Sequence, residues 1–334
     1  MCQRFFFLFG LPLSAIAIVS FAGANTNCRA ESPAKTAASS SYSVEMVDDG
    51  VEIKLGGQLL TKYWASHTSR PILWPLIGFD GVELTRGYPM QDALPSEKKD
   101  HVHHRSFWFN HGEVNGLDFW SEAKSAGKIS AIGSPKISGG DTATLKARHQ
   151  WNDMDGNRVL TDQWHLTFAH DDKLRWIDCV FTLTASEGDV NFGDTKEGSF
   201  GIRVAGTMKV DAKQGGKIRN AEGLIDSAAW AQASSWVDYY GPVSDGIHGI
   251  AILNHPDSFN YPTRWHVRTY GLFAANPFGV SHFVGGSKTA GTTLKKGESM
   301  TFGYRVVIHR GDTESAGIPA VWEAYRATKL AEPN

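Results

Sequence analysis

Four of the 13 histidines lie between His101 and His111, the highest density of titratable rings in the sequence. Imidazoles exchange protons near neutral pH, and neutral imidazoles bind transition metals. In an extended segment His101 and His103 would share one face, and His104 would point to the other. A chain turn at His104 and Arg105 would instead bring more of the rings together. The cluster therefore predicts a site of proton transfer or of metal binding.

A second polar segment, residues 193–203, is a glycine-flanked acidic loop that leads into a predicted strand. Glu197 lies between a lysine and a glycine, so its carboxylate is expected at a sheet edge that a ligand can approach closely. Arg203 is placed to orient an anionic or hydroxylated group. We therefore predict that Glu197 transfers protons and that Arg203 binds substrate.

A third segment, residues 262–279, combines aromatic rings with polar side chains, among them Trp265, His266, Arg268 and Asn276. Sugar rings have apolar C–H faces and polar rims, so a carbohydrate site needs aromatic platforms beside amide and charged groups. Trp265 would serve as such a platform unless it packs in an ordinary apolar core. The segment predicts a substrate-binding role for these four residues.

Strand-like alternation of apolar and polar residues recurs along the chain and has to position these segments. Asp49 and Gly50 form a turn signal that predicts a β-hairpin at 44–55. Further strands are predicted at 143–151, 159–168, 174–183, 202–210, 249–253, 265–273 and 300–309. Helical spacing is convincing only near the C-terminus, around Trp322 and Tyr325. The pattern predicts an all-β fold, an antiparallel two-sheet β-sandwich with a short C-terminal helix.

The N-terminal segment has the features of a secretory signal peptide. Arg4 precedes a long apolar stretch, and small residues end at Ala24, where cleavage is expected. The following residues are rich in Ala, Ser and Thr, as in a solvated linker. The expected organisation is a signal peptide at 1–24, a flexible linker at 25–41, and one β-sandwich domain with its C-terminal helix at 42–334. The mature protein is expected to be secreted or periplasmic.

Two cysteines remain after this cleavage, Cys28 in the linker and Cys179 in a predicted strand. They could pair in an oxidising compartment. Cys179 alternates with Ile177 and Phe181 as a core-facing strand residue does. We therefore expect the two thiols to stay unpaired.

The charge balance excludes two classes of partner. The chain has 33 Lys and Arg against 35 Asp and Glu, a formal net charge of −2, without long runs of one sign. Nucleic-acid and polybasic membrane binding both need concentrated positive charge. No segment after the signal peptide is apolar enough to span a bilayer. A carbohydrate or another small substrate fits this composition better.

Several motifs together resemble the family labelled methane oxygenase PmoA-like, a domain of unknown function numbered 6807. They are RGYPM at 86–90, HVHHRS at 101–106, HGEVNGLDFW at 111–120, DTKEG at 194–198 and WHVR at 265–268. The resemblance runs from about Tyr63 to Arg310. The membrane methane monooxygenase subunit of that name needs several long apolar spans, and this chain has none after its signal peptide. The resemblance implies a secreted bacterial β-sandwich similar to the galactose mutarotase supersandwich, a fold shared by epimerases, lyases and glycosidases.

The first functional hypothesis is a carbohydrate-active enzyme without a cofactor. His103 or His104 would act as general acid and Glu197 as general base, in mutarotation or epimerisation, in elimination from a uronate, or in hydrolysis. Two-carboxylate hydrolysis has the least support, because no paired carboxylates with an obvious spacing are found. The expected substrate-binding residues are His101, Arg105, His111, Arg203, Trp265, His266, Arg268 and Asn276, with Arg203 or Arg105 neutralising a uronate.

Two alternatives remain open. In the first, His101, His103 and either His111 or His266 bind a divalent metal ion that activates water or polarises a carbonyl. In the second, the protein is a noncatalytic glycan-binding module.

Overall fold

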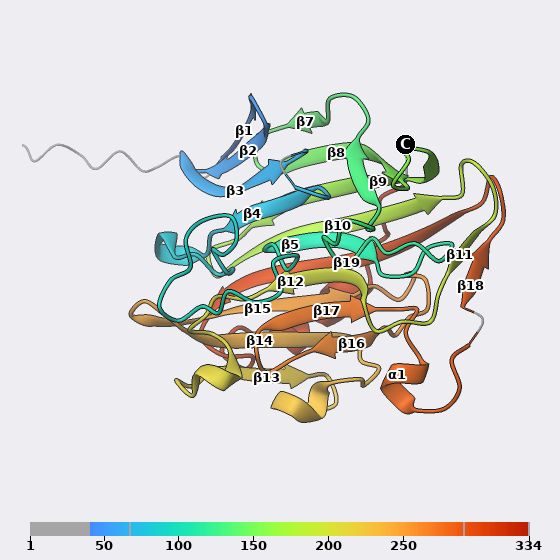
Figure 1. The fold of residues 1–334 in the computed structure, drawn as a ribbon. Helices are drawn as coiled ribbons and strands as arrows, with labels where there is room; N and C mark the ends of the chain where they lie inside the picture. The colour runs from blue at the N-terminus through green and yellow to red at the C-terminus, as the bar shows by residue number, and fades with distance from the viewer. Residues whose placement is uncertain (1–40, 67, 290, 333–334) are drawn as a thin grey trace, which may run out of the picture. The chain divides into compact units, whose positions relative to one another are not determined.

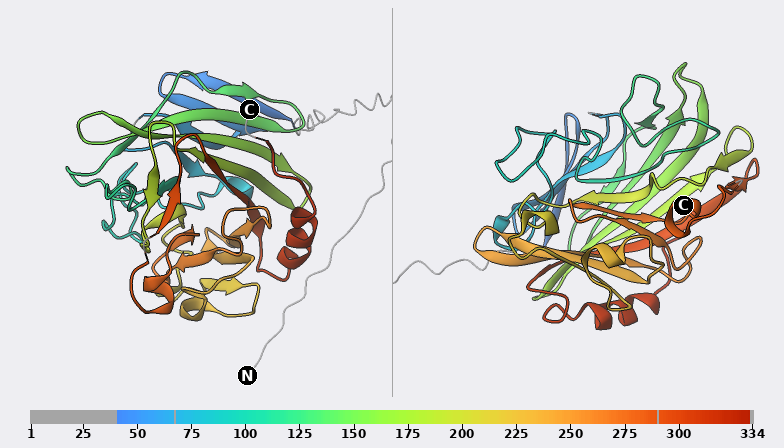
Figure 2. Two further views of the ribbon diagram at one scale, coloured as in Figure 1. Left: turned by 90° about the vertical axis from the view of Figure 1, so that its right-hand side faces the viewer. Right: turned by 60° about the horizontal axis from the view of Figure 1, so that its bottom comes forward.

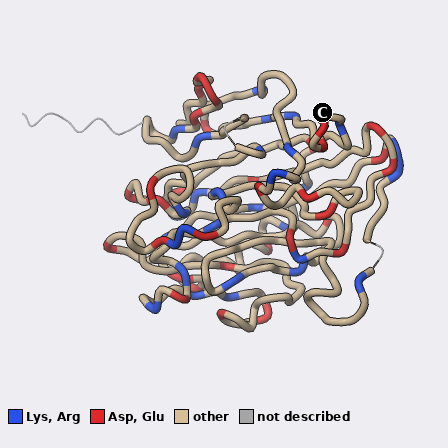
Figure 3. The backbone as a smooth tube through the Cα atoms, in the orientation of Figure 1, with Lys and Arg blue, Asp and Glu red and all other residues tan. Residues whose placement is uncertain are grey.

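Alternating apolar and polar residues build two large antiparallel sheets in the computed structural model, which describes residues 41–66, 68–289 and 291–332 (Figure 1). The predicted signal peptide, nearly all of the linker and Cys28 lie outside the described residues. Within the described part, no helix is long and apolar enough to cross a membrane. Basic and acidic residues are interspersed along the backbone (Figure 3).

The eight-stranded sheet carries the segments with candidate chemistry. Its strands, in spatial order, are β1 (Tyr42–Val47), β2 (Gly50–Leu55), β3 (Gln58–Trp64), β4 (Ile72–Leu76), β5 (Phe107–His111), β12 (Gly198–Arg203), β17 (Leu272–Asn276) and β16 (Arg264–Val267). The antiparallel pairing of β5 with β12, and of β12 with β17, joins three segments that are far apart in the sequence. Non-local pairing of this kind lets one sheet assemble a site from distant residues.

The nine-stranded sheet faces the first one (Figure 2). Its main path is β13 (Lys217–Asn220), β14 (Trp236–Val243), β15 (Gly246–Asn254), β19 (Ser299–Arg310), β10 (Leu174–Thr184), β9 (Arg158–His170), β8 (Ala143–Asn152) and β6 (Lys128–Ala131), and β7 (Lys136–Ser138) also pairs with β8. A small sheet pairs β11 (Val190–Phe192) with β18 (Thr292–Leu294). The described helices are α1 (Ser281–Val284) and α2 (Ile318–Arg326), with 3₁₀ turns at Phe79–Gly81, Val210–Ala212 and Asp226–Ala229.

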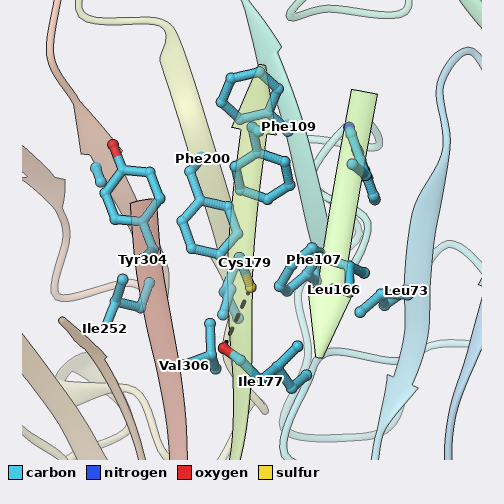
Figure 4. Close-up of a cluster of buried hydrophobic side chains, with 14 of the residues drawn as sticks. Leu73, Phe107, Phe109, Leu166, Ile177, Cys179, Phe200, Ile252, Tyr304 and Val306 are labelled. Atoms are coloured by element: carbon cyan, nitrogen blue, oxygen red, sulfur yellow. Dashed lines mark hydrogen bonds between the residues drawn. The ribbon is translucent and has the colours of Figure 1, made fainter. Parts of the chain in front are cut away.

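The core lies between the two sheets and is rich in aromatic rings (Figure 4). Phe107 and Phe109 of β5 and Phe200 of β12 lie in this core, and Phe200 contacts Tyr304 of β19. Burial of each such ring removes a large apolar surface from water and contributes roughly 1.5–3 kcal/mol. Cys179 is fully buried in the same cluster, as its alternation predicts.

The predicted fold class is confirmed, and so are most of the predicted strands. The hairpin forms with Val47 opposite Gly50, and α2 packs Tyr325 against the outer face of the nine-stranded sheet. Two predictions need correction. The strand expected at 202–210 ends at Arg203, and the strand expected at 265–273 is two strands, because the chain turns at Gly271 with φ +103°. Glycine accepts this backbone conformation without strain.

Candidate active site

A cavity of about 670 Å³ opens on the face of the eight-stranded sheet that points away from the core. On β5, the rings of Phe107 and Phe109 enter the core, whereas Trp108 points to this outer face. The cavity is lined by His101, His103, His104, Gly112, Asp118, Trp120, Ser121, Lys196, Glu197, His266, Arg268 and Tyr270. Each of the three chemistry-bearing segments predicted from the sequence contributes to this lining.

The histidine cluster is a turn and not a strand. The amide of His104 donates to the carbonyl of His101 at 2.9 Å, and His101 has φ 42°. The turn stacks four rings in one column, with centroid distances of 5.4 Å from Tyr270 to His101, 4.8 Å from His101 to His104 and 5.4 Å from His104 to Trp108. His103 meets the His104 ring edge-on at 4.5 Å. The turn therefore gathers the imidazoles that a strand would have separated.

Two buried arginines hold this turn through backbone carbonyls. Arg86, 2% exposed, donates to the carbonyl oxygens of Lys98, Asp100, His101 and His104. Arg70, 1% exposed, donates to the carbonyl oxygens of His103, Phe119 and Trp120. The planar guanidinium makes several fixed hydrogen bonds at once, so two side chains fix both loops that form the cavity wall.

His104 is held in one tautomer. The Arg203 guanidinium donates to its Nδ1 at 3.0 Å, and Arg203 is itself bound to Asp100 at 3.2 Å. Because a guanidinium has no acceptor, Nδ1 of His104 is unprotonated and the neutral ring carries its proton on Nε2. Burial, together with the neighbouring His103 and Arg203, holds the pKa of His104 well below its usual value.

His266 is held in the opposite tautomer. Its Nδ1 lies 2.9 Å from the carbonyl oxygen of Lys196, which can only accept, so Nδ1 carries the proton and Nε2 keeps its lone pair. Burial lowers the pKa of His266 to about 4, although the nearby Glu197 opposes the shift. Burial also lowers the pKa of His103 to about 4, assisted by the charge of Arg70. These rings are neutral at physiological pH.

Glu197 lies directly before β12, beside the histidines. Its carboxylate forms an ion pair with Lys196, and its charge acts on both His103 and His266. The amide of Gly112 donates to the backbone carbonyl of Glu197 at 2.6 Å, and a Cβ at Gly112 would lie 2.7 Å from the Cβ of Glu197. Only glycine allows this approach, which brings the ends of β5 and β12 together at the cavity.

Two residues predicted to bind substrate lie in the core or face it. Trp265 is fully buried between the sheets and donates to the carbonyl of Ser234 at 2.9 Å. It is not the expected platform, because alternation along β16 points Trp265 inward and His266 outward. His111 is buried too, with Nε2 donating to the carbonyl of Gly193 at 2.9 Å.

Three other residues predicted to bind substrate do not line the cavity. They are Arg105, Asn276 and Arg203. Arg105 forms a two-pronged ion pair with Glu122 at 2.7 and 2.8 Å, so it is not free to neutralise a substrate. Asn276 donates to the carbonyl of Thr195 at 2.8 Å and accepts two backbone amides. Arg203 supports His104 from behind. The structure thus gives these predicted binding residues positioning contacts.

Three of the four alternative metal ligands line the cavity, and the fourth does not. His101, His103 and His266 line the cavity, but His111 points away from it on β5. Across residues 41–66, 68–289 and 291–332, no three His, Cys, Asp or Glu side chains form a group that could hold a metal ion. The metal-dependent alternative therefore stays a prediction, without a preformed ligand group among the described side chains.

Tyr270, Lys196 and Trp120 were not among the predicted site residues, and all three line the cavity. A signal for Tyr270 was present, because it follows His266 and Arg268 at a spacing of two. Trp120 belongs to a loop whose path has no such periodicity.

A model described as a family of unknown function, DUF6807, matches residues 50–323. No curated protein matches the sequence.

Similar solved structures include a glycoside hydrolase family 97 enzyme from Pseudoalteromonas sp. strain K8 in complex with panose, at 10% identity and TM-score 0.35, covering 88% of this chain and 37% of that one. A family 36 α-galactosidase from Geobacillus stearothermophilus has 12% identity and TM-score 0.36, covering 82% and 39%. A putative aldose 1-epimerase from Escherichia coli K12 has 11% identity and TM-score 0.34, covering 81% and 98%. This chain spans less than half the length of the two hydrolases. Likenesses this distant leave the function to be inferred from the cavity.

Proposed function

We propose that this chain, which belongs to the DUF6807 family of unknown function, is a carbohydrate-active enzyme that transfers protons on a sugar or uronate bound in the cavity. One observation carries the proposal. Neutral imidazoles held in defined tautomers and a carboxylate line the same cavity, although they come from segments far apart in the sequence.

In this proposal Glu197 is the general base and His104 the polarising donor. The neutral His104 ring offers Nε2–H to a substrate oxygen, which is a different role from the protonated general acid expected from the sequence. A neutral imidazole stabilises a developing oxyanion by hydrogen bonding and requires no imidazolium in the buried site. The lone pair on Nε2 of His266 provides a second acceptor for a substrate hydroxyl.

The lining of the cavity fits a sugar better than an apolar ligand. Rings of Tyr270 and Trp120 lie beside imidazole, guanidinium and carboxylate groups, which matches the apolar faces and polar rims of a sugar. The volume is within the range of roughly 300–1,000 Å³ that small-molecule sites occupy.

Proton transfer is favoured over two-carboxylate hydrolysis. The second carboxylate of the cavity, Asp118, accepts hydrogen bonds from the backbone amides of Trp120 and Ser121 and from the Ser121 hydroxyl. These bonds commit it to the loop and leave Glu197 as the carboxylate for the reaction. Epimerisation or mutarotation and elimination are therefore the leading reactions. The signal-like N-terminal sequence places this activity outside the cytoplasm in our proposal.

The test is a substrate screen of the purified mature chain against neutral sugars, uronates and their oligosaccharides. Polarimetry reports mutarotation, ultraviolet absorbance reports the unsaturated product of elimination, and reducing-end assays report hydrolysis. Glu197→Gln and His104→Ala are expected to lower kcat about a hundredfold or more with KM little changed. Glu45→Gln, an exposed site on β1, is the matched control. Full activity of Glu197→Gln on the true substrate, or glycan binding without any turnover, contradicts the proposal.

A further inference from the structure

The cavity contains one basic side chain whose charge is not balanced by a described partner. Lys196 pairs with Glu197, and Arg203, behind the wall, pairs with Asp100. Across the described residues, the guanidinium of Arg268 has neither an ion pair nor a hydrogen bond to protein, although it lines the cavity.

Aromatic rings hold this guanidinium in place. Its central carbon lies 5.4 Å from the ring centroid of Trp230 and 5.8 Å from that of Tyr270. Cation–π contacts orient a guanidinium without neutralising it and leave its N–H groups free to bind an anion. The Tyr270 ring is itself positioned by stacking on His101 at 5.4 Å.

The charge of Arg268 acts on a neighbouring imidazole of the cavity, that of His266. After burial, which is the main cause, Arg268 contributes to the lowered pKa of His266. The two carboxylates of the cavity are already bound, Glu197 by Lys196 and Asp118 by the loop amides. No described protein anion is therefore left to balance Arg268, and a ligand anion would balance it.

We propose that Arg268 binds the carboxylate of an acidic sugar, so that the substrate class of the cavity is a uronate. The assignment rests on the proposed function. Guanidinium and carboxylate groups match in plane and spacing and form paired charge-assisted hydrogen bonds. Arg268 thus takes the neutralising role that the sequence suggested for Arg203 or Arg105, both of which have protein partners. Neutralising the carboxylate would stabilise the negative charge that proton abstraction beside it creates.

The experiment compares matched pairs of ligands by isothermal titration calorimetry on the mature chain. Glucuronate and galacturonate, with their oligosaccharides, are each measured against the neutral sugar of the same configuration, and sulfated galactose is a third arm. We expect the uronates to bind more tightly than the neutral sugars. Arg268→Gln should weaken uronate binding about 10- to 100-fold and weaken neutral-sugar binding much less. Arg148→Gln, an exposed arginine on β8, removes the same charge outside the cavity and should change nothing.

Three binding results overturn the assignment. They are equal affinity for uronate and neutral sugar, unchanged uronate affinity in Arg268→Gln in a protein with a normal melting curve, and a preference for the sulfated sugar over the uronate. Turnover of a neutral sugar that depends on Glu197 and His104 would overturn the uronate assignment while leaving the proposed function intact. Loss of the proposed function itself would show as absent turnover of every sugar.

Discussion

At the residue scale, two of the imidazoles that line the cavity, those of His104 and His266, differ because their Nδ1 atoms have different partners. Arg203 can only donate to His104, and the Lys196 carbonyl can only accept from His266. In the proposed mechanism, His104 therefore offers Nε2–H to a ligand, whereas His266 offers a lone pair. Two residues of one type thereby supply a donor and an acceptor without any change of charge.

This arrangement predicts the titration of the rings. The pKa values of His103 and His266 are expected at about 4 because burial disfavours the imidazolium form. Both rings should stay neutral as the pH falls from 7 to about 5 and take up protons only near pH 4. Nitrogen-15 NMR of labelled histidine measures both the titration and the tautomers, with Nε2–H on His104 and Nδ1–H on His266. Imidazolium signals from these rings at pH 6 would contradict the assignment.

A second residue-scale prediction distinguishes an aromatic residue of the core, Trp265, from one of the cavity, Tyr270. Trp265→Ala empties a fully buried position and should lower the free energy of unfolding by about 3–5 kcal/mol. Tyr270→Ala removes a half-buried cavity ring and should weaken ligand binding with a smaller effect on stability. Denaturant unfolding and calorimetric titration measure the two effects. A selective loss of affinity in Trp265→Ala, at unchanged stability, would restore its role as a sugar platform.

At the element scale, the alternation of apolar and polar residues was sufficient to predict a strand that has one apolar and one polar face. β8 and β9 show this pattern and were predicted nearly to their ends. β5, which reads FWFNH, was not predicted, because loops cover its outer face and all five residues are buried. The alternation of β16 does indicate that Trp265 is a core residue, since Trp265 and Val267 share the apolar face.

The sequence predicted which segments form the site, but it did not predict how their side chains are arranged in space. The density of polar and titratable residues in the sequence pointed to the histidine cluster, Glu197 and His266, and all of these except His111 line the cavity. The turn that gathers the imidazoles depends on Arg86 and Arg70, whose partners are backbone carbonyls. Every residue has a backbone carbonyl, so no pattern of side chains in the sequence reveals which carbonyls accept these hydrogen bonds.

The dependence of the turn on Arg86 is testable. Arg86→Lys keeps the charge, but one ammonium cannot replace the fork that binds four carbonyl oxygens. Amide hydrogen exchange is expected to accelerate at least tenfold in residues 98–104 and not in β8, with turnover falling in parallel. Arg158→Lys, in an exposed ion pair with Glu187, is the control. Unchanged exchange in the turn would show that other contacts fix it.

At the scale of the whole molecule, the site and the helix-bearing face occupy different sheets. The cavity opens on the eight-stranded sheet, whereas α2 covers the outer face of the nine-stranded sheet. A buried polar link ties the loop before α2 to that second sheet. His309 of β19 donates to Asp238 of β14 at 3.0 Å, and the Thr313 hydroxyl donates to the same carboxylate at 2.7 Å.

The hydrogen bond from His309 to Asp238 passes over β15 at Gly249. β15 lies between β14 and β19, and a Cβ on Gly249 would lie 2.2 Å from the ring of His309. The absence of a side chain there lets the imidazole reach Asp238. Nδ1 of His309 also lies 3.2 Å from the carbonyl of Arg310, so both ring nitrogens donate and the ring is an imidazolium. Burial alone would lower the pKa of His309, but the charge of Asp238 outweighs it and the pKa is raised.

The raised pKa of His309 predicts how the stability of the whole fold depends on pH. Its contribution is complete below the ordinary imidazole pKa of 6.5, declines above that value, and is lost once the pH passes the folded pKa. His309→Gln should cost about 3–5 kcal/mol at pH 6, because Asp238 stays buried without its cation. The gap to the unmodified protein should narrow as the pH rises. Urea unfolding from pH 6 to pH 9 measures this, with exposed His282→Gln as control. A gap that stays constant over this range would mean that His309 is neutral in the folded protein and holds Asp238 by a hydrogen bond alone.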